Sequence, residues 1–144
     1  MNKILVITYH YVRNYEKEFP NLKILRFNKF KKQLNFLSKN YKIIDYFELL
    51  KALETGKKLP KNACWLTFDD GYIDHYKFVL PELKKRNIKG SFFPVVNSVK
   101  RNIILDVNKI QFILSKSKKP EAIYEILKSI ILKKLGKKSF ENYK

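Results

Sequence analysis

The sequence predicts an α/β protein in which parallel strands alternate with helices. Short continuous apolar runs, rich in β-branched and aromatic residues, are typical of strands buried in a parallel sheet. Between these runs, apolar residues recur at helical spacing, and such alternation implies parallel strands joined by right-handed crossovers. The 144 residues suit one domain, and a hydrophobic content of 45% is enough to form a core.

Four strands are expected, at residues 4–7, 41–44, 64–68 and 91–96. The third run contains the only cysteine, Cys64, so no disulfide can form within the chain. A cysteine in an apolar strand is most often a buried structural thiol, and we expect that role here.

The first of the helices between these strands carries Phe27, Phe30, Leu34 and Leu37 at helical spacing. Asn28 is its candidate N-terminal cap.

Two further helices have recognisable start or stop signals. Asp45 and Glu48 resemble a capping box that opens the second helix, and Gly56 is expected to end it. In the third helix, Asp74 is the candidate cap. Pro81 either kinks this helix or opens a second one directly after it.

Beyond residue 96 the pattern weakens. Residues 103–105 form a brief apolar run, and residues 110–114 fit one or two helical turns. A helical stripe then predicts a C-terminal amphipathic helix that ends at Gly136; it comprises Ile123, Ile126, Leu127, Ile130, Ile131 and Leu135. Four strand–helix units cannot close a barrel that normally takes eight strands and roughly 250 residues. The architecture is therefore either an open α/β sheet or an unfinished barrel.

The chain is strongly basic, with 31 Lys and Arg against 13 Asp and Glu and a net charge of +18. Because the lysines are spread along the whole chain, a specific nucleic-acid site is disfavoured. An anionic membrane surface or an anionic glycan suits a diffuse field better. The lysines beside the C-terminal stripe are compatible with a membrane-surface helix, although such stripes more often pack on a core or a partner. The N-terminal apolar run is too short for a signal peptide or a membrane span, which predicts a cytoplasmic protein or one on the cytoplasmic face of a membrane.

The segment with most chemical content is residues 66–72, Leu-Thr-Phe-Asp-Asp-Gly-Tyr. Neighbouring side chains of a strand point to opposite faces, but a turn begun by Gly71 would present Asp69 and Asp70 at one strand end. The carboxyl ends of parallel strands are where α/β proteins bind their ligands. One carboxylate can hold a metal while the other takes a proton, as in hydrolases that use a metal-bound water. The alternative is a turn whose aspartates cap the next helix.

The chain has two histidines. His10 directly follows the first strand, so we expect it to face Asp69 and Asp70, with a metal-ligand role as the weaker interpretation. His75 is expected to be a solvated residue at a helix terminus near the site. Tyr72 also lies near the site, and neither it nor His75 has an assigned role. Because no pair such as His-x-x-x-His exists, a zinc site with three protein ligands cannot be assembled in the usual way.

Residues 67–72, Thr-Phe-Asp-Asp-Gly-Tyr, resemble the first motif of the polysaccharide deacetylases, carbohydrate esterase family 4, also called the NodB-homology domain. Residues 8–12, 30–37, 80–85 and 90–93 also resemble the family, so the similarity covers roughly residues 1–97. It implies an incomplete (β/α) barrel of the deacetylase type. Residues 1–115 would form a partial NodB-homology domain, and residues 116–144 a Lys-rich amphipathic helix and tail.

The resemblance implies a hydrolase that cleaves the acetamide C–N bond of N-acetylated sugars with a divalent metal, usually zinc. Asp69 would be the general base and Asp70 a metal ligand. The family's second motif supplies two histidine ligands, but residues 97–102 contain none, and Asp106 is the one chemical substitute nearby. The substrate would be an N-acetylated glycan or glycolipid. Either a second polypeptide would complete the barrel, or the sequence represents the N-terminal half of the domain. The alternative is a non-catalytic relative that acts as a glycan-binding or partner-binding subunit.

Overall fold

The structure is a computed structural model that describes residues 3–14 and 17–141, with no description of the side chains of residues 120 and 135–141. The described residues fall into two compact units. The first comprises residues up to 14 and 23–104, and the second comprises residues 17–22 and 105–141. The predicted domain division at residues 115 and 116 stays a prediction.

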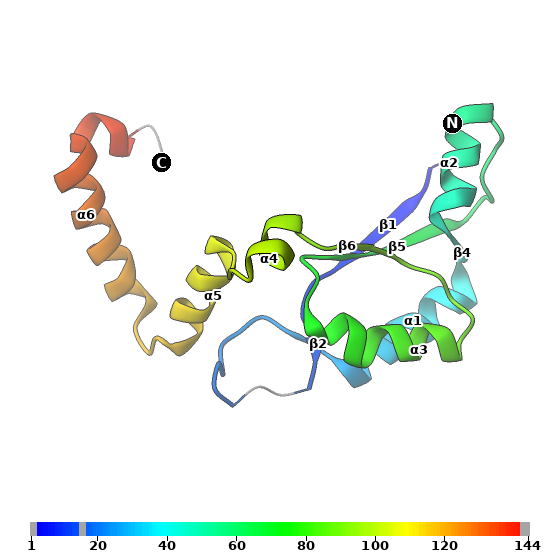
Figure 1. Cartoon of the computed structure of the whole chain (residues 1–144), viewed down its shortest axis with the longest axis horizontal. Helices are drawn as coiled ribbons and strands as arrows, with labels where there is room; N and C mark the ends of the chain where they lie inside the picture. Colours follow the sequence, from blue (N-terminus) through cyan, green and yellow to red (C-terminus); the bar gives the residue numbers. More distant parts are fainter. Residues whose placement is uncertain (1–2, 15–16, 142–144) are drawn as a thin grey trace. The chain divides into compact units, whose positions relative to one another are not determined.

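A parallel sheet forms the centre of the first unit (Figure 1). Its central strand is β5 (Ala63–Asp69), which pairs with β1 (Leu5–Tyr9) along one edge. Along the other edge, β4 (Lys42–Ile44) pairs with the beginning of β5, and β6 (Ser91–Phe93) pairs with its end. All of these pairings are parallel, so the predicted α/β class is confirmed.

A second, smaller pair of strands lies outside this sheet. It is formed by β2 (Val12–Arg13) and β3 (Leu25–Arg26), which also run parallel. This pair could not be predicted from the sequence, because two-residue strands carry no measurable periodicity.

Five helical segments belong to the first unit. α1 (Phe27–Asn40) and α2 (Tyr46–Thr55) precede β5, and a π-helical turn, η1 (His75–Val79), runs into α3 (Leu80–Lys85) after it. A short helix, α4 (Val96–Arg101), follows β6.

The core lies between one face of β5 and the helices α1, η1 and α3. On β5 the residues that face these helices alternate along the strand, as the two-residue period of a strand requires. Each such apolar side chain contributes roughly 1.5–3 kcal/mol when it is fully buried. The side chains of this core cluster that are at most 2% exposed are Val12, Phe30, Leu34, Cys64, Leu66, Phe68, Val79 and Leu83. The predicted burial of the cysteine is thus confirmed.

The predicted limits of α2 are also confirmed. The Glu48 amide donates to Asp45 Oδ1 at 2.8 Å, and the Asp45 amide donates to Glu48 Oε2 at 2.9 Å, which is a complete capping box. Gly56 ends the helix with a φ of 69°, in the left-handed region that a residue with a Cβ adopts only at a cost.

Two predicted caps are wrong. α1 begins at Phe27, one residue before Asn28, and the side chain of its capping residue, Arg26, makes no cap hydrogen bond. Helical structure after the Asp-Asp-Gly turn already starts at residue 73, so Asp74 lies inside the helix. Its carboxylate accepts a hydrogen bond from Arg13 instead of capping the backbone.

Proline explains two other boundaries. Pro81 lies in the first turn of α3, directly after the π-helical turn, which is the part of a helix where proline is best tolerated. The fourth strand ends at Phe93, three residues earlier than expected, because Pro94 cannot donate to the ladder. The predicted strand end, Val96, is the first residue of α4.

The second unit consists of α5 (Asp106–Lys116), α6 (Pro120–Glu141) and the segment 17–22. The Phe19 ring packs on Phe112 with 4.6 Å between centroids, and Lys116 Nζ binds Glu18 at 3.2 Å. These contacts hold the segment 17–22 against α5.

The C-terminal helix is present, but its predicted end is wrong. α6 continues through Gly136 to Glu141, because one glycine costs a helix interior only about 1 kcal/mol. Its amphipathic character stays a prediction, and the side chain of Leu135 lies outside the described residues. Across residues 3–14 and 17–141, no helix combines the length and the apolar composition needed to cross a bilayer.

Candidate active site

The turn at the end of β5 places two carboxylates side by side. Asp69 is the last residue of the strand, and Asp70 follows with a φ of 71°, which is uncommon for a residue other than glycine. The Asp70 amide donates to the Phe93 carbonyl at 3.0 Å, which ties the turn to the end of β6. Backbone held in this region costs about 1–3 kcal/mol and is found preferentially at functional sites.

Gly71 is required by the space around it as well as by its conformation. Its φ is 69°, and a Cβ built there would lie 2.8 Å from Pro94 Cβ and 3.1 Å from Pro94 Cα. Any side chain would therefore push the turn away from the segment that follows β6.

The Asp70 carboxylate has two partners on one oxygen. Tyr72 Oη donates to Asp70 Oδ2 at 2.7 Å, and His10 Nδ1 lies 3.2 Å from the same oxygen. Within residues 3–14 and 17–141, no hydrogen bond involves Asp70 Oδ1. One oxygen of this carboxylate is thus fixed, while the other remains available to a ligand.

His10 reaches Asp70 because of strand register. β1 and β5 pair in parallel with Tyr9 opposite Phe68, so the residue after Tyr9 emerges at the level of Asp69. The structure thus places His10 at the edge of the sheet where the sequence predicted it.

Asp69 differs from its neighbour in being without a polar contact. Its side chain is half-buried, and no hydrogen bond or ion pair to it is present among the described residues. An ionised carboxylate with no hydrogen-bond donor on it has its lone pairs open to a proton.

Tyr72 is held by stacking. Its ring lies 4.0 Å from that of Tyr11, with 29° between the planes. Since Tyr11 follows His10 directly, the segment after β1 positions both groups that contact Asp70.

His75 contradicts the sequence expectation. It was predicted to be solvated, but it is only 4% exposed and its Nε2 donates to the His10 carbonyl at 2.8 Å. Burial is the main cause of a lowered pKa for this imidazole. The prediction failed because the burial depends on the segment after β1 lying across the helix, which no local pattern reports.

A second link joins the same two segments, and sequence reasoning missed it. Arg13 Nε donates to Asp74 Oδ2 at 2.7 Å, and the Asp74 side chain is 4% exposed. The partners are 61 positions apart, so no spacing rule could have paired them.

Comparison with known proteins identifies the family. Residues 56–131 match the family model described as polysaccharide deacetylase, which is more than half of the chain. The chain belongs to the polysaccharide deacetylase family. None of the curated proteins matches it significantly.

Solved structures of deacetylases resemble this member of the family. A de-N-acetylase from Aggregatibacter actinomycetemcomitans is 26% identical with a TM-score of 0.60, over 71% of this chain and 42% of that one. The Streptococcus pyogenes deacetylase PplD, solved in complex with acetate, is 25% identical with a TM-score of 0.60, over 74% and 50%. IcaB from Ammonifex degensii is 26% identical with a TM-score of 0.58, over 68% and 40%. The chain therefore spans half or less of the length of each of these proteins.

A divalent metal is generally part of deacetylase chemistry, but the residues that the structure describes do not hold one by themselves. They contain no group of three or more His, Cys, Asp and Glu side chains that could bind an ion. A catalytic zinc site normally has three protein ligands. Asp106, the predicted chemical substitute, is exposed and pairs with Lys109 at 2.8 Å, which lowers its pKa.

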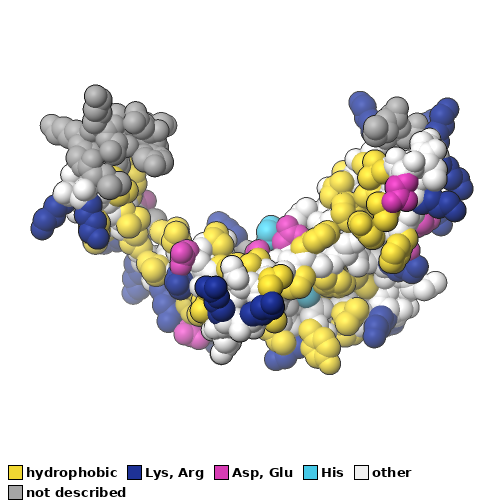
Figure 2. Space-filling model, turned by 45° about the horizontal axis from the view of Figure 1, so that its top comes forward, with side chains coloured by type: hydrophobic (Ala, Val, Ile, Leu, Met, Phe, Trp, Pro, Cys, Tyr) yellow, Lys and Arg dark blue, Asp and Glu magenta, His cyan; other side chains and the backbone are white. Residues whose placement is uncertain are grey.

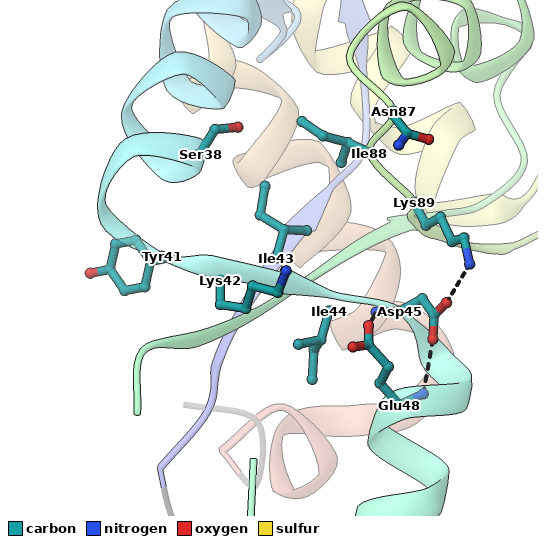
Figure 3. Close-up of a pocket in the computed structure, with 10 residues that line it drawn as sticks. All are labelled: Ser38, Tyr41, Lys42, Ile43, Ile44, Asp45, Glu48, Asn87, Ile88 and Lys89. Carbon is teal, nitrogen blue, oxygen red and sulfur yellow. Dashed lines mark hydrogen bonds and ion pairs between the residues drawn. The ribbon is translucent and has the colours of Figure 1, made fainter. Parts of the chain in front are cut away.

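A pocket of the first unit lies away from these carboxylates (Figure 3). It has a volume of about 320 Å³, and its polar lining includes Asp45, Glu48 and Lys89. Lys89 Nζ donates to Asp45 Oδ2 at 2.7 Å, and this hydrogen bond is the main cause of the lowered pKa of Asp45. The opposite charges of Asp45 and Lys89 neutralise each other, and Asp45 also caps α2. These residues therefore have a structural role, and we assign no catalytic function to this pocket.

Proposed function

We propose that the chain supplies the two-carboxylate part of a de-N-acetylase site, which hydrolyses the acetamide C–N bond of an N-acetylated glycan or glycolipid. The observation that carries the proposal is the pair Asp69 and Asp70 at the carboxyl end of the central strand, on a turn with left-handed backbone. Family membership and the likeness to de-N-acetylases support it.

Asp69 is the proposed general base. Hydrolysis adds a water oxygen to the acetamide carbonyl carbon while a base accepts a proton from that water. The C–N bond then breaks, the amine takes a proton, and acetate and the free amino sugar leave. The half-buried Asp69 suits this role because none of the described residues donates to its carboxylate.

Asp70 is the proposed metal ligand, through Oδ1. His10 and Tyr72 orient the carboxylate by contacting Oδ2, at 3.2 Å and 2.7 Å. The remaining ligands of a divalent cation, zinc by family resemblance, would come from polypeptide outside these 144 residues, and so would the strands that complete a barrel of the deacetylase type.

The basic surface suits an anionic partner. Lys and Arg side chains are spread over the face shown in Figure 2, among hydrophobic ones. Such a distribution attracts an anionic glycan or membrane surface without specifying a sequence or shape. This attraction would raise the rate at which an anionic substrate meets the site.

A second candidate function is that of a non-catalytic relative that binds a glycan or a partner. The observation in its favour is that the described residues contain no group of three metal-binding side chains.

One experiment separates the two functions. The full-length gene product is incubated with Zn²⁺ and N-acetylglucosamine oligomers, while acetate release and oligomer binding are measured on the same sample. The enzyme hypothesis predicts acetate release that the Asp70→Asn variant loses. Oligomer binding without acetate would support the non-catalytic relative and overturn the proposed hydrolysis.

A further inference from the structure

We infer that His75 is a positioning residue for the carboxylate site: its Nε2–H holds the main-chain carbonyl of His10 and thereby keeps the His10 ring beside Asp70. The inference rests on the proposed function of that site. Its structural content can be tested without substrate or metal.

The hydrogen bond defines the tautomer of His75. A carbonyl oxygen only accepts, so Nε2, at 2.8 Å from the His10 oxygen, must carry the hydrogen. His75 Nδ1 is buried and has no hydrogen-bond partner among the described residues. Burial disfavours a second proton on the ring, which agrees with the lowered pKa of His75. The neutral tautomer with hydrogen on Nε2 follows.

The ring of His75 is fixed by its surroundings. Its centroid lies 5.6 Å from that of Phe68, 5.7 Å from that of Tyr72 and 5.9 Å from that of Phe92. Side chains packed among aromatic rings change rotamer with difficulty, because protein interiors are close-packed. The donor on Nε2 is therefore presented at a constant position.

The His10 ring, in contrast, has little packing to hold it. Its side chain is 54% exposed, and the ring makes a polar contact with Asp70 Oδ2. The ring's position then depends on the backbone of residue 10, which is where His75 binds.

Adjacent residues of one helix hold the segment at two points. Asp74 pairs with Arg13 at 2.7 Å, and His75 binds the carbonyl of His10. Two bonds from neighbouring helical residues fix the direction of the segment as well as its distance from the helix. Since the helix follows the Asp-Asp-Gly turn directly, this arrangement couples the two strand ends that form the site.

The test uses the chain's two histidines as reporters. Protein labelled with ¹⁵N in histidine is studied by long-range proton–nitrogen NMR, which distinguishes the tautomers and gives one set of ring signals per histidine. Asp70→Asn first establishes how far the His10 signals move when their contact is altered. His75→Gln keeps a donor at the position of Nε2, whereas His75→Phe keeps a ring without a donor. Val79→Ala, a fully buried position on the same helical segment, controls for general loosening of the core.

The inference predicts hydrogen on Nε2 of His75 in the unaltered protein. It predicts that His75→Phe moves the His10 signals about as far as Asp70→Asn does, while His75→Gln and Val79→Ala leave them in place. Hydrogen on Nδ1, or unmoved His10 signals in a folded His75→Phe protein, would overturn it. If His75→Phe does not fold, the tautomer and His75→Gln decide: displaced His10 signals in His75→Gln count against the inference. Acetate release, measured separately, reports on the proposed function alone.

Discussion

Replacing Gly71 by alanine should destabilise the fold more than the same change at Gly56. Both glycines have a φ of 69°, so both substitutions carry the cost of left-handed backbone, about 1–2 kcal/mol. At Gly56 the added Cβ meets nothing within 4 Å, whereas at Gly71 it meets Pro94 Cβ at 2.8 Å. Overpacking of this kind typically costs a further 1–3 kcal/mol or so.

The expected losses are therefore about 1–2 kcal/mol for Gly56→Ala and about 2–5 kcal/mol for Gly71→Ala. The larger loss is a substantial part of the roughly 5–15 kcal/mol by which proteins of this size are stable. Urea denaturation followed by far-ultraviolet circular dichroism gives both free energies of unfolding. Equal losses in the two variants would show that Pro94 does not close the turn and would refute the steric argument.

Two further predictions concern ion pairs. Arg13→Leu leaves the buried Asp74 carboxylate without its ion-pair partner and should lower the free energy of unfolding by about 3–5 kcal/mol. Adding Asp74→Asn to the Arg13→Leu variant should restore part of the lost free energy of unfolding, measured by urea denaturation. No restoration would contradict the assignment of the loss to a buried, unpaired carboxylate. Lys89 lowers the pKa of Asp45 from its ordinary value of 3.8, so the pair stabilises the fold above that pH. This contribution is lost as the pH falls through the lower folded pKa, and the unfolding curves of Lys89→Met and the unaltered protein should converge there; a constant difference in stability down to acid pH would contradict the assignment.

Features encoded by near neighbours were predictable from the sequence. The capping box of Asp45 and Glu48 and the left-handed Gly56 form from residues within one helix, and the structure has both. The strand before the Asp-Asp-Gly turn was equally clear, because its continuous apolar run reflects burial on both faces.

Features that depend on distant segments could not be predicted. His75 was misjudged because its partner, the His10 carbonyl, is 65 positions away. The predicted capping role of Asp74 is wrong for the same reason, since local spacing does not reveal its actual partner, Arg13. Whether a carboxylate binds a nearby backbone amide or a guanidinium far away in the sequence is decided only in the folded chain.

The candidate site was partly predictable because parallel strands share an edge. The rule predicted from the sequence alone that His10 lies near Asp69, and the strand register agrees. It could not assign contacts, such as the hydrogen bond from Tyr72 to Asp70 Oδ2. Such contacts depend on the left-handed conformation of Asp70. The sequence indicates a turn at this point through Gly71, but it does not specify the conformation of Asp70.

The most direct test of the central proposal is the rate of acetate release by the full-length gene product and by its Asp69→Asn variant, with Zn²⁺ and N-acetylglucosamine oligomers. Asp45→Asn is the matched control, because it makes the same chemical change at a helix cap that asparagine fills equally well. If Asp69 is the general base, its replacement should lower the rate by about 10²–10⁴-fold at unchanged thermal stability, and the control should keep the rate. Equal rates for Asp69→Asn and the unaltered protein would contradict the account.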